Sequence, residues 1–150
     1  MTKLLEGQTF AVINASGLIL GRLASIVAKR LLIGESIIIV NAEKAVLSGR
    51  RLSRVNDARA YLEIGHPRKG PFHPRRPDQI VRRAVRGMLP HRMPKGRMAF
   101  RRLRVFLGIP DDLKNEKLLT FREADVSKLK RSYVTIGEIA KEIGFSHGGA

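Results

Sequence analysis

The N-terminal part of the chain alternates short apolar runs with one longer apolar segment. Residues 9–14, TFAVIN, predict a short buried strand. Residues 36–41, SIIIVN, form a β-branched run typical of a strand that is buried on both faces. Between them, residues 21–32 predict a helix that is apolar around most of its circumference and that Gly34 is suited to end. Strand, buried helix and buried strand in this order indicate a parallel βαβ unit.

The segment that follows is more polar. Residues 42–49 predict a loop around a short extended piece, and residues 51–64 predict a second helix. The spacing of this helix places Leu52, Val55 and Leu62 towards the core, and Arg50, Arg51 and Arg54 away from it.

Residues 65–77 form a different kind of segment, which we call the proline loop. Its sequence HPRKGP at 66–71 is nearly repeated as HPRRP at 73–77. The prolines forbid a regular helix or a central strand, and the basic side chains cannot be buried. We therefore expect a stiff loop that lies on a surface or on a partner.

Residues 78–89 predict an amphipathic helix, with Pro77 in its first turn, Asp78 complementing the helix dipole and Pro90 ending it. One side is apolar, with Ile80, Val81, Ala84, Val85 and Met88, and the other carries Arg82, Arg83 and Arg86, which we call the arginine face. An ordinary solvated helix pairs such charges with acids three or four residues away. Only Arg82 has such an acid, so the pattern favours binding of a polyanion.

The remainder of the chain predicts shorter elements. Residues 91–97 predict a loop, residues 98–103 a short helical piece and residues 105–107 an apolar strand. A capping box, Thr135-x-x-Glu138, opens a C-terminal helix whose apolar residues are Ile136, Ile139, Ala140 and Ile143. We expect order to fade in the tail, residues 147–150.

Charge is concentrated in residues 66–104, which we call the basic segment. The chain has 29 Lys and Arg against 13 Asp and Glu, and 13 of the basic residues lie in this segment with Asp78 as its single acid. Such a dense positive surface repels itself and attracts a polyanion, of which nucleic acid is the commonest. Its 11 arginines and two lysines favour nucleic acid over a membrane surface, because guanidinium binds phosphate bidentately and stacks on bases.

Size and composition set the broad class. A chain of 150 residues suggests a single domain, residues 1–150, that can bury a core. No apolar run approaches the ~20 residues that span a bilayer. The first ten residues, MTKLLEGQTF, lack the apolar core of a signal peptide, so we expect a cytoplasmic protein.

Other chemistries find little support. The absence of cysteine excludes disulfides, thiolate zinc sites and thiol catalysis. Gly17 and Gly21 invite a phosphate-loop interpretation, but neither the dinucleotide nor the NTPase motif is present and the residues between them are apolar. His66, His73 and His91 lack the further ligands of a zinc site, so contact with bases or phosphate suits them better. No serine has the neighbours of a catalytic nucleophile.

Four stretches together resemble one family. They are residues 21–25 (GRLAS), residues 40–44 (VNAEK) with Ser48 and Gly49, residues 83–90 (RAVRGMLP) and residues 103–110 (LRVFLGIP). In this order the chain resembles the thirteenth protein of the large ribosomal subunit, the universal L-thirteen family. The proline loop resembles the archaeal and eukaryotic branch. Residues 111–134 match no part of the pattern, so their role stays open.

The resemblance implies a three-layer α/β/α domain with a mostly parallel four-stranded sheet. It also implies a structural, ribosome-bound constituent of the large subunit that binds 23S-type rRNA, supports early assembly, and has no catalytic residue, cofactor, metal or small-molecule substrate. Its partners would be large-subunit rRNA and neighbouring ribosomal proteins, with no membrane. The expected RNA contacts are Arg22, Lys44, Ser48, Arg68, Lys69, Arg75, Arg76, Arg82, Arg83, Arg86, His91, Arg92, Lys95, Arg97, Arg101, Arg102 and Arg104. A nucleotide-binding enzyme that uses the Gly17–Gly21 turn and a DNA-compacting protein remain as alternatives.

Overall fold

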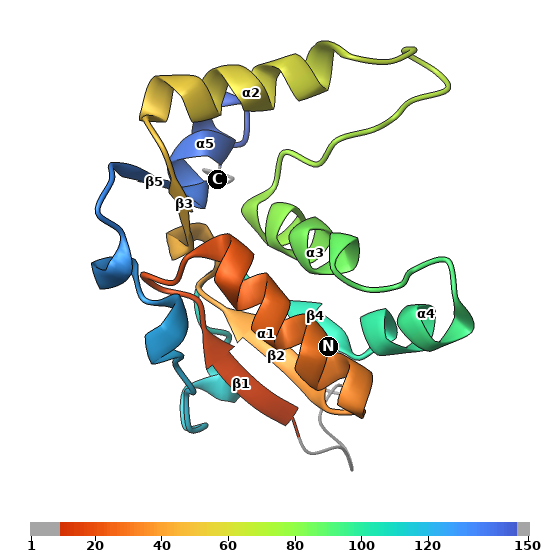
Figure 1. The fold of residues 1–150 in the computed structure, drawn as a ribbon, viewed down its shortest axis with the longest axis vertical. Coiled ribbons are helices and arrows are strands. Elements are labelled where there is room, and N and C mark those ends of the chain that lie inside the picture. Colours follow the sequence, from red (N-terminus) through yellow and green to blue (C-terminus); the bar gives the residue numbers. More distant parts are fainter. Residues whose placement is uncertain (1–9, 147–150) are drawn as a thin grey trace.

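The computed structural model describes residues 10–146, and Figure 1 shows the arrangement of their helices and strands. Residues 1–9 and 147–150, which include the predicted tail, lie outside the described residues. The elements in chain order are β1 (Phe10–Asn14), α1 (Leu20–Ile33), β2 (Ser36–Val40), β3 (Val46–Ser48), α2 (Arg51–Glu63), α3 (Pro77–Gly87), α4 (Pro94–Arg101), β4 (Leu103–Val105), β5 (Tyr133–Thr135) and α5 (Ile136–Glu142), with four short 3-10 turns.

The predicted βαβ unit is present and forms the centre of the fold. β1 pairs in parallel with β2, from Phe10 opposite Ser36 to Asn14 opposite Val40, and α1 connects them. The backbone of Gly34 at the end of α1 has a φ of 118°, a conformation that glycine adopts without strain. β4 adds to β2 in parallel, and β3 forms a separate antiparallel pair with β5. The α/β class is confirmed, with three strands in the main sheet where the resemblance implied four.

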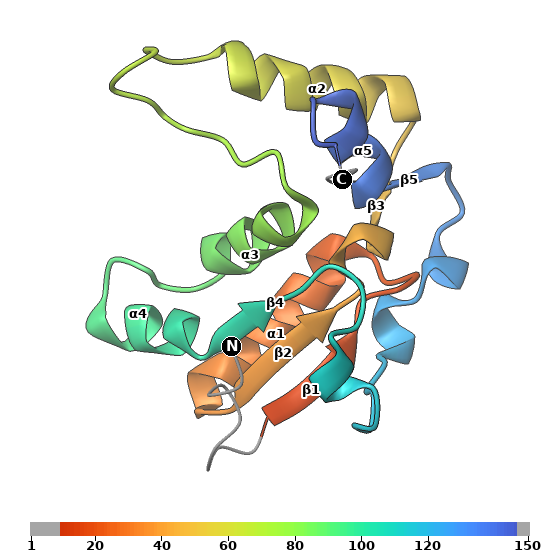
Figure 2. The same ribbon diagram turned by 180° about the vertical axis from the view of Figure 1, so that it is seen from behind.

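The two faces of the main sheet are covered differently. Alternate β2 residues point to opposite faces, so Ile37 and Ile39 join the large core with α1, α3 and α4, whereas Ile38 and Val40 join a smaller cluster. Residues 106–129, which we call the strap, consist of coil and 3-10 turns, and their first half covers that second face through Phe106, Ile109, Leu113 and Leu118 (Figure 2). The resemblance implied α-helices in both outer layers; here all the described helices that pack on the main sheet lie on one face.

The strap gives a structural role to residues whose sequence matched nothing. It runs beside β1, where the N–H of Leu119 donates to the Val12 carbonyl and the N–H of Asn14 donates to the Leu119 carbonyl, at 2.8 and 3.0 Å. Further on, Ala124 is fully buried in the large core. The strap therefore occupies the edge of the sheet that β1 would otherwise expose.

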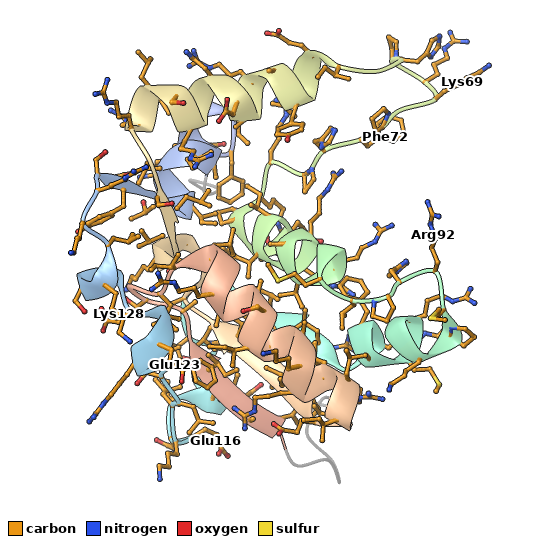
Figure 3. The ribbon with its side chains drawn as sticks, viewed as in Figure 1. Lys69, Phe72, Arg92, Glu116, Glu123 and Lys128 are labelled. Carbon is orange, nitrogen blue, oxygen red and sulfur yellow. The ribbon has the colours of Figure 1, made fainter. Side chains whose placement is uncertain are left out.

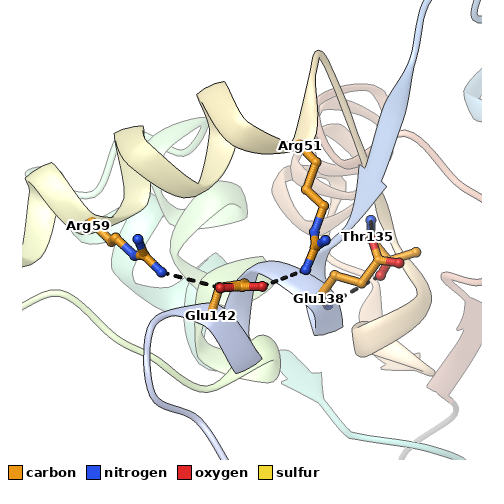
Figure 4. A network of polar contacts seen from close by, with 5 residues as sticks. All are labelled: Arg51, Arg59, Thr135, Glu138 and Glu142. Carbon is orange, nitrogen blue, oxygen red and sulfur yellow. Dashed lines mark hydrogen bonds and ion pairs between the residues drawn. The ribbon is translucent and has the colours of Figure 1, made fainter.

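α2 and α5 form a smaller layer at one end of the molecule. The predicted capping box of α5 is present, with Thr135 and Glu138 each accepting a backbone N–H of the other. Glu142 of α5 accepts hydrogen bonds from two arginines of α2, Arg51 and Arg59, and so clamps the two helices together (Figure 4). A carboxylate shared by two guanidinium groups fixes the helix pair more firmly than one exposed ion pair does.

Two predictions about the α2 side chains are wrong, and a third is met only in part, since Leu62 is half-buried. Leu52 was expected to face the core but is 73% exposed, and only Val55 of this helix is buried. Arg54 was expected to face solvent but is half-buried, and its Nε donates to the Ser48 carbonyl at 2.8 Å. α2 packs mainly against α5 and β5 rather than on the main sheet, so its buried side does not follow the predicted core side.

The elements after α3 begin earlier than predicted. α4 starts at Pro94 rather than at Met98, because proline is well suited to the first turn of a helix. Gly96 allows that turn to pack closely, since a Cβ there would lie 2.1 Å from the Pro90 carbonyl oxygen. β4 spans Leu103–Val105 rather than residues 105–107, and the next residue, Phe106, already packs in the cluster under the strap.

Candidate nucleic-acid interface

The basic segment forms a continuous path along one side of the molecule. The proline loop leaves the end of α2, projects away from the body and returns to α3; a second loop then leads to α4 and β4 (Figure 1). Figure 3 shows Lys69 and Phe72 on the proline loop, and Arg92 extending from the connection between α3 and α4 towards the side on which that loop lies. Residues that are far apart in the sequence thus border one open region.

α3 attaches this path to the core, as its amphipathic pattern predicted. Val81 and Val85 are fully buried against α1 and β4, and Arg83 and Arg86 are exposed on the opposite side. Met88 was expected on the apolar side but is 45% exposed, because α3 ends at Gly87 and Met88 is already outside its last turn.

The single acid of the basic segment is used locally. Asp78 is buried in the first turn of α3, where it forms an ion pair with Arg76 at 3.1 Å and accepts a hydrogen bond from Gln79 at 3.2 Å. Arg83 and Arg86 therefore lie on a surface with no carboxylate paired to them among the described residues. The positive potential of this surface is not neutralised within the fold.

Arg82 differs from the other two members of the arginine face. It is half-buried, and its guanidinium carbon lies 4.7 Å from the centre of the Phe100 ring. Its Nε is buried and has no hydrogen-bond partner among the described residues. Stacking on an aromatic ring holds the plane of a guanidinium in one orientation. Arg82 therefore packs against the fold, whereas Arg83 and Arg86 are exposed, and Arg83 bonds only the backbone carbonyl of Phe72 among the described residues.

Arg102 has a role inside the fold that the sequence did not predict. Its Nη2 donates to the Leu31 carbonyl at 2.7 Å, near the C-terminal end of α1. A cation at this position also complements the helix dipole. Arg102 thus ties the start of β4 to α1, and its guanidinium is half-buried rather than displayed.

Internal contacts hold the proline loop in place. Within its tip, the N–H groups of Arg68 and Lys69 donate to Nδ1 of His66 at 3.1 and 3.3 Å. At its base, the His73 ring lies 5.3 Å from the Tyr61 ring of α2. The loop therefore presents its charged side chains from a partly ordered backbone.

The other expected contact residues divide between this path and the body. Along the basic segment, Arg75, Arg92, Lys95, Arg97, Arg101 and Arg104 are exposed, and His91 is half-buried with its ring edge-on to Phe100 at 5.7 Å. Arg22, Lys44 and Ser48 lie instead on the body, at the start of α1 and around β3. Arg22 donates to the Glu123 carbonyl of the strap at 3.3 Å.

A groove between the proline loop and α3 contains residues that the sequence did not single out. It is lined by Phe72, His73, Pro74, Gln79, Arg82, Arg83, Arg86 and Phe100, and we call it the aromatic–arginine groove. Phe72 and Phe100 are the only aromatic residues, apart from histidine, in the basic segment. That isolated occurrence was the available signal, since aromatic rings among arginines are typical of surfaces on which bases stack.

The glycine turn before α1 is not arranged to hold a phosphate. The N–H groups of Gly17, Leu18 and Ile19 donate to backbone carbonyls at 3.2, 3.1 and 2.7 Å. Leu18 and Ile19 are also buried, so the N–H groups of these three residues are not available to an anion. The turn is a packing element that joins β1 to α1.

Residues 10–146 lack both a cluster of metal ligands and a helix that could span a membrane. In this range His, Asp and Glu do not gather in any group of three or more that could hold a metal ion. None of the helices described here is both long and apolar enough to cross a membrane.

Comparison with known proteins identifies the family. The model of the family described as ribosomal protein L13 matches residues 8–112. The large ribosomal subunit protein uL13 of Methanosarcina barkeri is 49% identical over 135 residues, covering 89% of this chain and 96% of the relative. The corresponding proteins of Archaeoglobus fulgidus and Methanopyrus kandleri are 45% and 44% identical, covering 93% and 99% of this chain and 90% and 95% of the relatives. The chain belongs to the ribosomal protein L13 family, which consists of structural proteins and not of enzymes.

Proposed function

We propose that this chain is a constituent of the large ribosomal subunit that binds large-subunit rRNA through the basic segment and supports early assembly of the subunit. In this role it is cytoplasmic and bound to the ribosome, next to other large-subunit proteins. The names of its relatives support the association with the large subunit. The rRNA contact rests on the surface described above.

The observation that carries the proposal is the division of α3 between two tasks. Val81 and Val85 dock this helix on the core, while Arg83 and Arg86 on the other side have no acid to neutralise them. A helix fixed in this way loses little entropy when its cations meet phosphate groups. Release of counterions from the RNA then supplies most of the affinity.

The experiment is to replace Arg83 and Arg86 together by Glu. Both side chains are exposed, so the variant should keep its thermal midpoint, while affinity for large-subunit rRNA should fall by about 100-fold or more at low salt because each reversal replaces attraction with repulsion. Filter binding over a range of salt concentrations measures the loss. For the unmodified chain, log K should fall with log salt at a slope of about −4 to −9 if six to ten phosphates are contacted.

The matched control replaces two exposed lysines of the body, Lys29 and Lys128, by Glu. It changes the net charge by the same amount, so it separates the effect of where the charge lies from the effect of the net charge itself. Equal losses in the two double variants, or a salt slope near zero for the unmodified chain, would contradict binding through the basic segment. A preference for duplex DNA over rRNA in competition would instead favour a DNA-compacting protein.

A further inference from the structure

Phe72 has an exposed ring on a backbone that is held on both sides. The residue is 72% exposed, more than any other phenylalanine or tyrosine in residues 10–146. Its carbonyl oxygen accepts a hydrogen bond from Nη1 of Arg83 at 3.3 Å, and the next residue, His73, packs against Tyr61. The ring itself rests over Gly70, where a Cβ would lie 3.1 Å from its Cδ2 atom. The loop therefore sets the position of the ring but leaves it open to solvent.

The opposite wall of the aromatic–arginine groove supplies cations in defined positions. The guanidinium of Arg82 lies over the Phe100 ring, which restricts its position, and its buried Nε has no hydrogen-bond partner among the described residues. Arg86 lies one turn further along α3, and Arg83 is already attached to the proline loop. The groove thus combines an open aromatic ring, planar cations and the amide of Gln79.

We propose that this groove binds a single unstacked nucleotide of RNA, with its base on the Phe72 ring and its phosphate on the arginines. The inference rests on the proposed function and specifies how part of that surface recognises RNA. A base inside a duplex is covered on both faces by its neighbours, so only an unpaired or extruded base can stack on a protein ring. The only acid in the basic segment, Asp78, is already paired with Arg76, so nothing on the groove wall repels a phosphate.

The test compares two RNA probes that differ only in pairing. One is a ten-nucleotide single strand with 2-aminopurine at its centre, and the other is the same strand annealed to its complement. Phe72→Leu keeps an apolar side chain but removes the ring face. It should weaken binding of the single strand by about tenfold and abolish the fluorescence quenching that stacking produces. The thermal midpoint should stay unchanged because the Phe72 side chain is exposed. Duplex affinity should also stay unchanged because paired bases cannot stack on the ring.

Two further variants complete the design. Phe72→Tyr keeps the ring and should bind both probes as the unmodified chain does. Tyr133→Leu removes another exposed aromatic ring, 54% exposed on β5 and outside the groove, and should change neither affinity nor quenching.

The outcomes separate this inference from the proposed function. If Phe72→Leu binds and quenches the single strand normally, or loses equal affinity for both probes, the stacking site is wrong while salt-dependent rRNA binding stands. If the unmodified chain shows no salt-dependent binding of rRNA, the proposed function fails and the inference fails with it.

Discussion

The helices α1 and α3 pack against each other, yet they divide their side chains differently. α1 buries six residues over its length, among them Leu23 and Val27, and only Gly21, Arg22, Lys29 and Ile33 of this helix are exposed. α3 fully buries Val81 and Val85 and displays Arg83 and Arg86, which form no ion pair among the described residues, on its outer side. Stability therefore comes mainly from α1 and the sheet, whereas α3 gives up part of its surface to charge.

The comparison teaches that folding and binding are separable over most of this chain. Arg82 and Arg102 are the half-buried exceptions, because each belongs to the basic segment but contacts the body of the fold. Arg76 and Arg83 also make contacts within the fold, but both are exposed. The following substitutions test where the boundary between the two tasks lies.

The largest effect on stability is expected in α1. Leu23→Ala leaves a cavity at a position that is fully buried, and should lower the free energy of unfolding by about 2–5 kcal/mol in urea titrations. RNA affinity, measured at low temperature where the variant is still folded, should not change. The control Ile33→Ala, at a residue 80% exposed, should change stability by less than about 0.5 kcal/mol. A large loss of RNA affinity in folded Leu23→Ala would break the separation.

A smaller effect on stability is expected at Arg102, where the substitution tests whether a residue of the basic segment serves folding or RNA binding. Arg102→Met keeps the apolar stem but removes the hydrogen bond to the Leu31 carbonyl, and should cost about 1–3 kcal/mol of stability. Its exposed neighbour provides the control, since Arg101→Met should leave stability unchanged and weaken RNA binding a few-fold. If the two variants behaved in the reverse way, Arg102 would be an RNA contact and Arg101 a structural residue.

The smallest effect is expected where α2 meets α5. Glu142→Gln weakens the clamp on Arg51 and Arg59, which are both more than half exposed, so stability should fall by less than about 1 kcal/mol. RNA affinity should rise, because the two arginines become available to phosphate. Glu63→Gln makes the same change of charge at the exposed end of α2 and should raise affinity less. Equal affinities in the two variants would show that net charge alone decides the effect.

Much of the fold could be predicted because the sequence pattern and the packing agree. The βαβ unit, the amphipathic α3 and the capped α5 each follow from periodicity and end signals that lie within a few residues of one another. Leu52 was misjudged because the less exposed side of α2 runs along Val55, Ala58 and Leu62 and leaves Leu52 outside it, which the apolar pattern alone does not reveal. The strap could not be predicted either, since it lies over the sheet in turns that carry no periodic pattern.

The candidate site was only partly predictable for a similar reason. Charge density located the basic segment and the spacing of α3 located Arg83 and Arg86, because both signals are local. The internal bond of Arg102 spans 71 positions, and the groove joins Phe72 to Phe100 across α3. Contacts between distant segments depend on the fold. The sequence therefore does not distinguish basic residues that are available to RNA from those that are bonded within the protein.

The strap has a consequence for the free chain, before it binds RNA. A sheet edge with free N–H and C=O groups is a template for pairing with another chain, and Leu119 already satisfies the edge of β1 at Val12 and Asn14. At the opposite side, β4 is short and carries the exposed Arg104, which discourages strand pairing. Aggregation of the newly synthesised chain with cellular polyanions should therefore be electrostatic and not driven by strand pairing. Raising the salt concentration should reverse it.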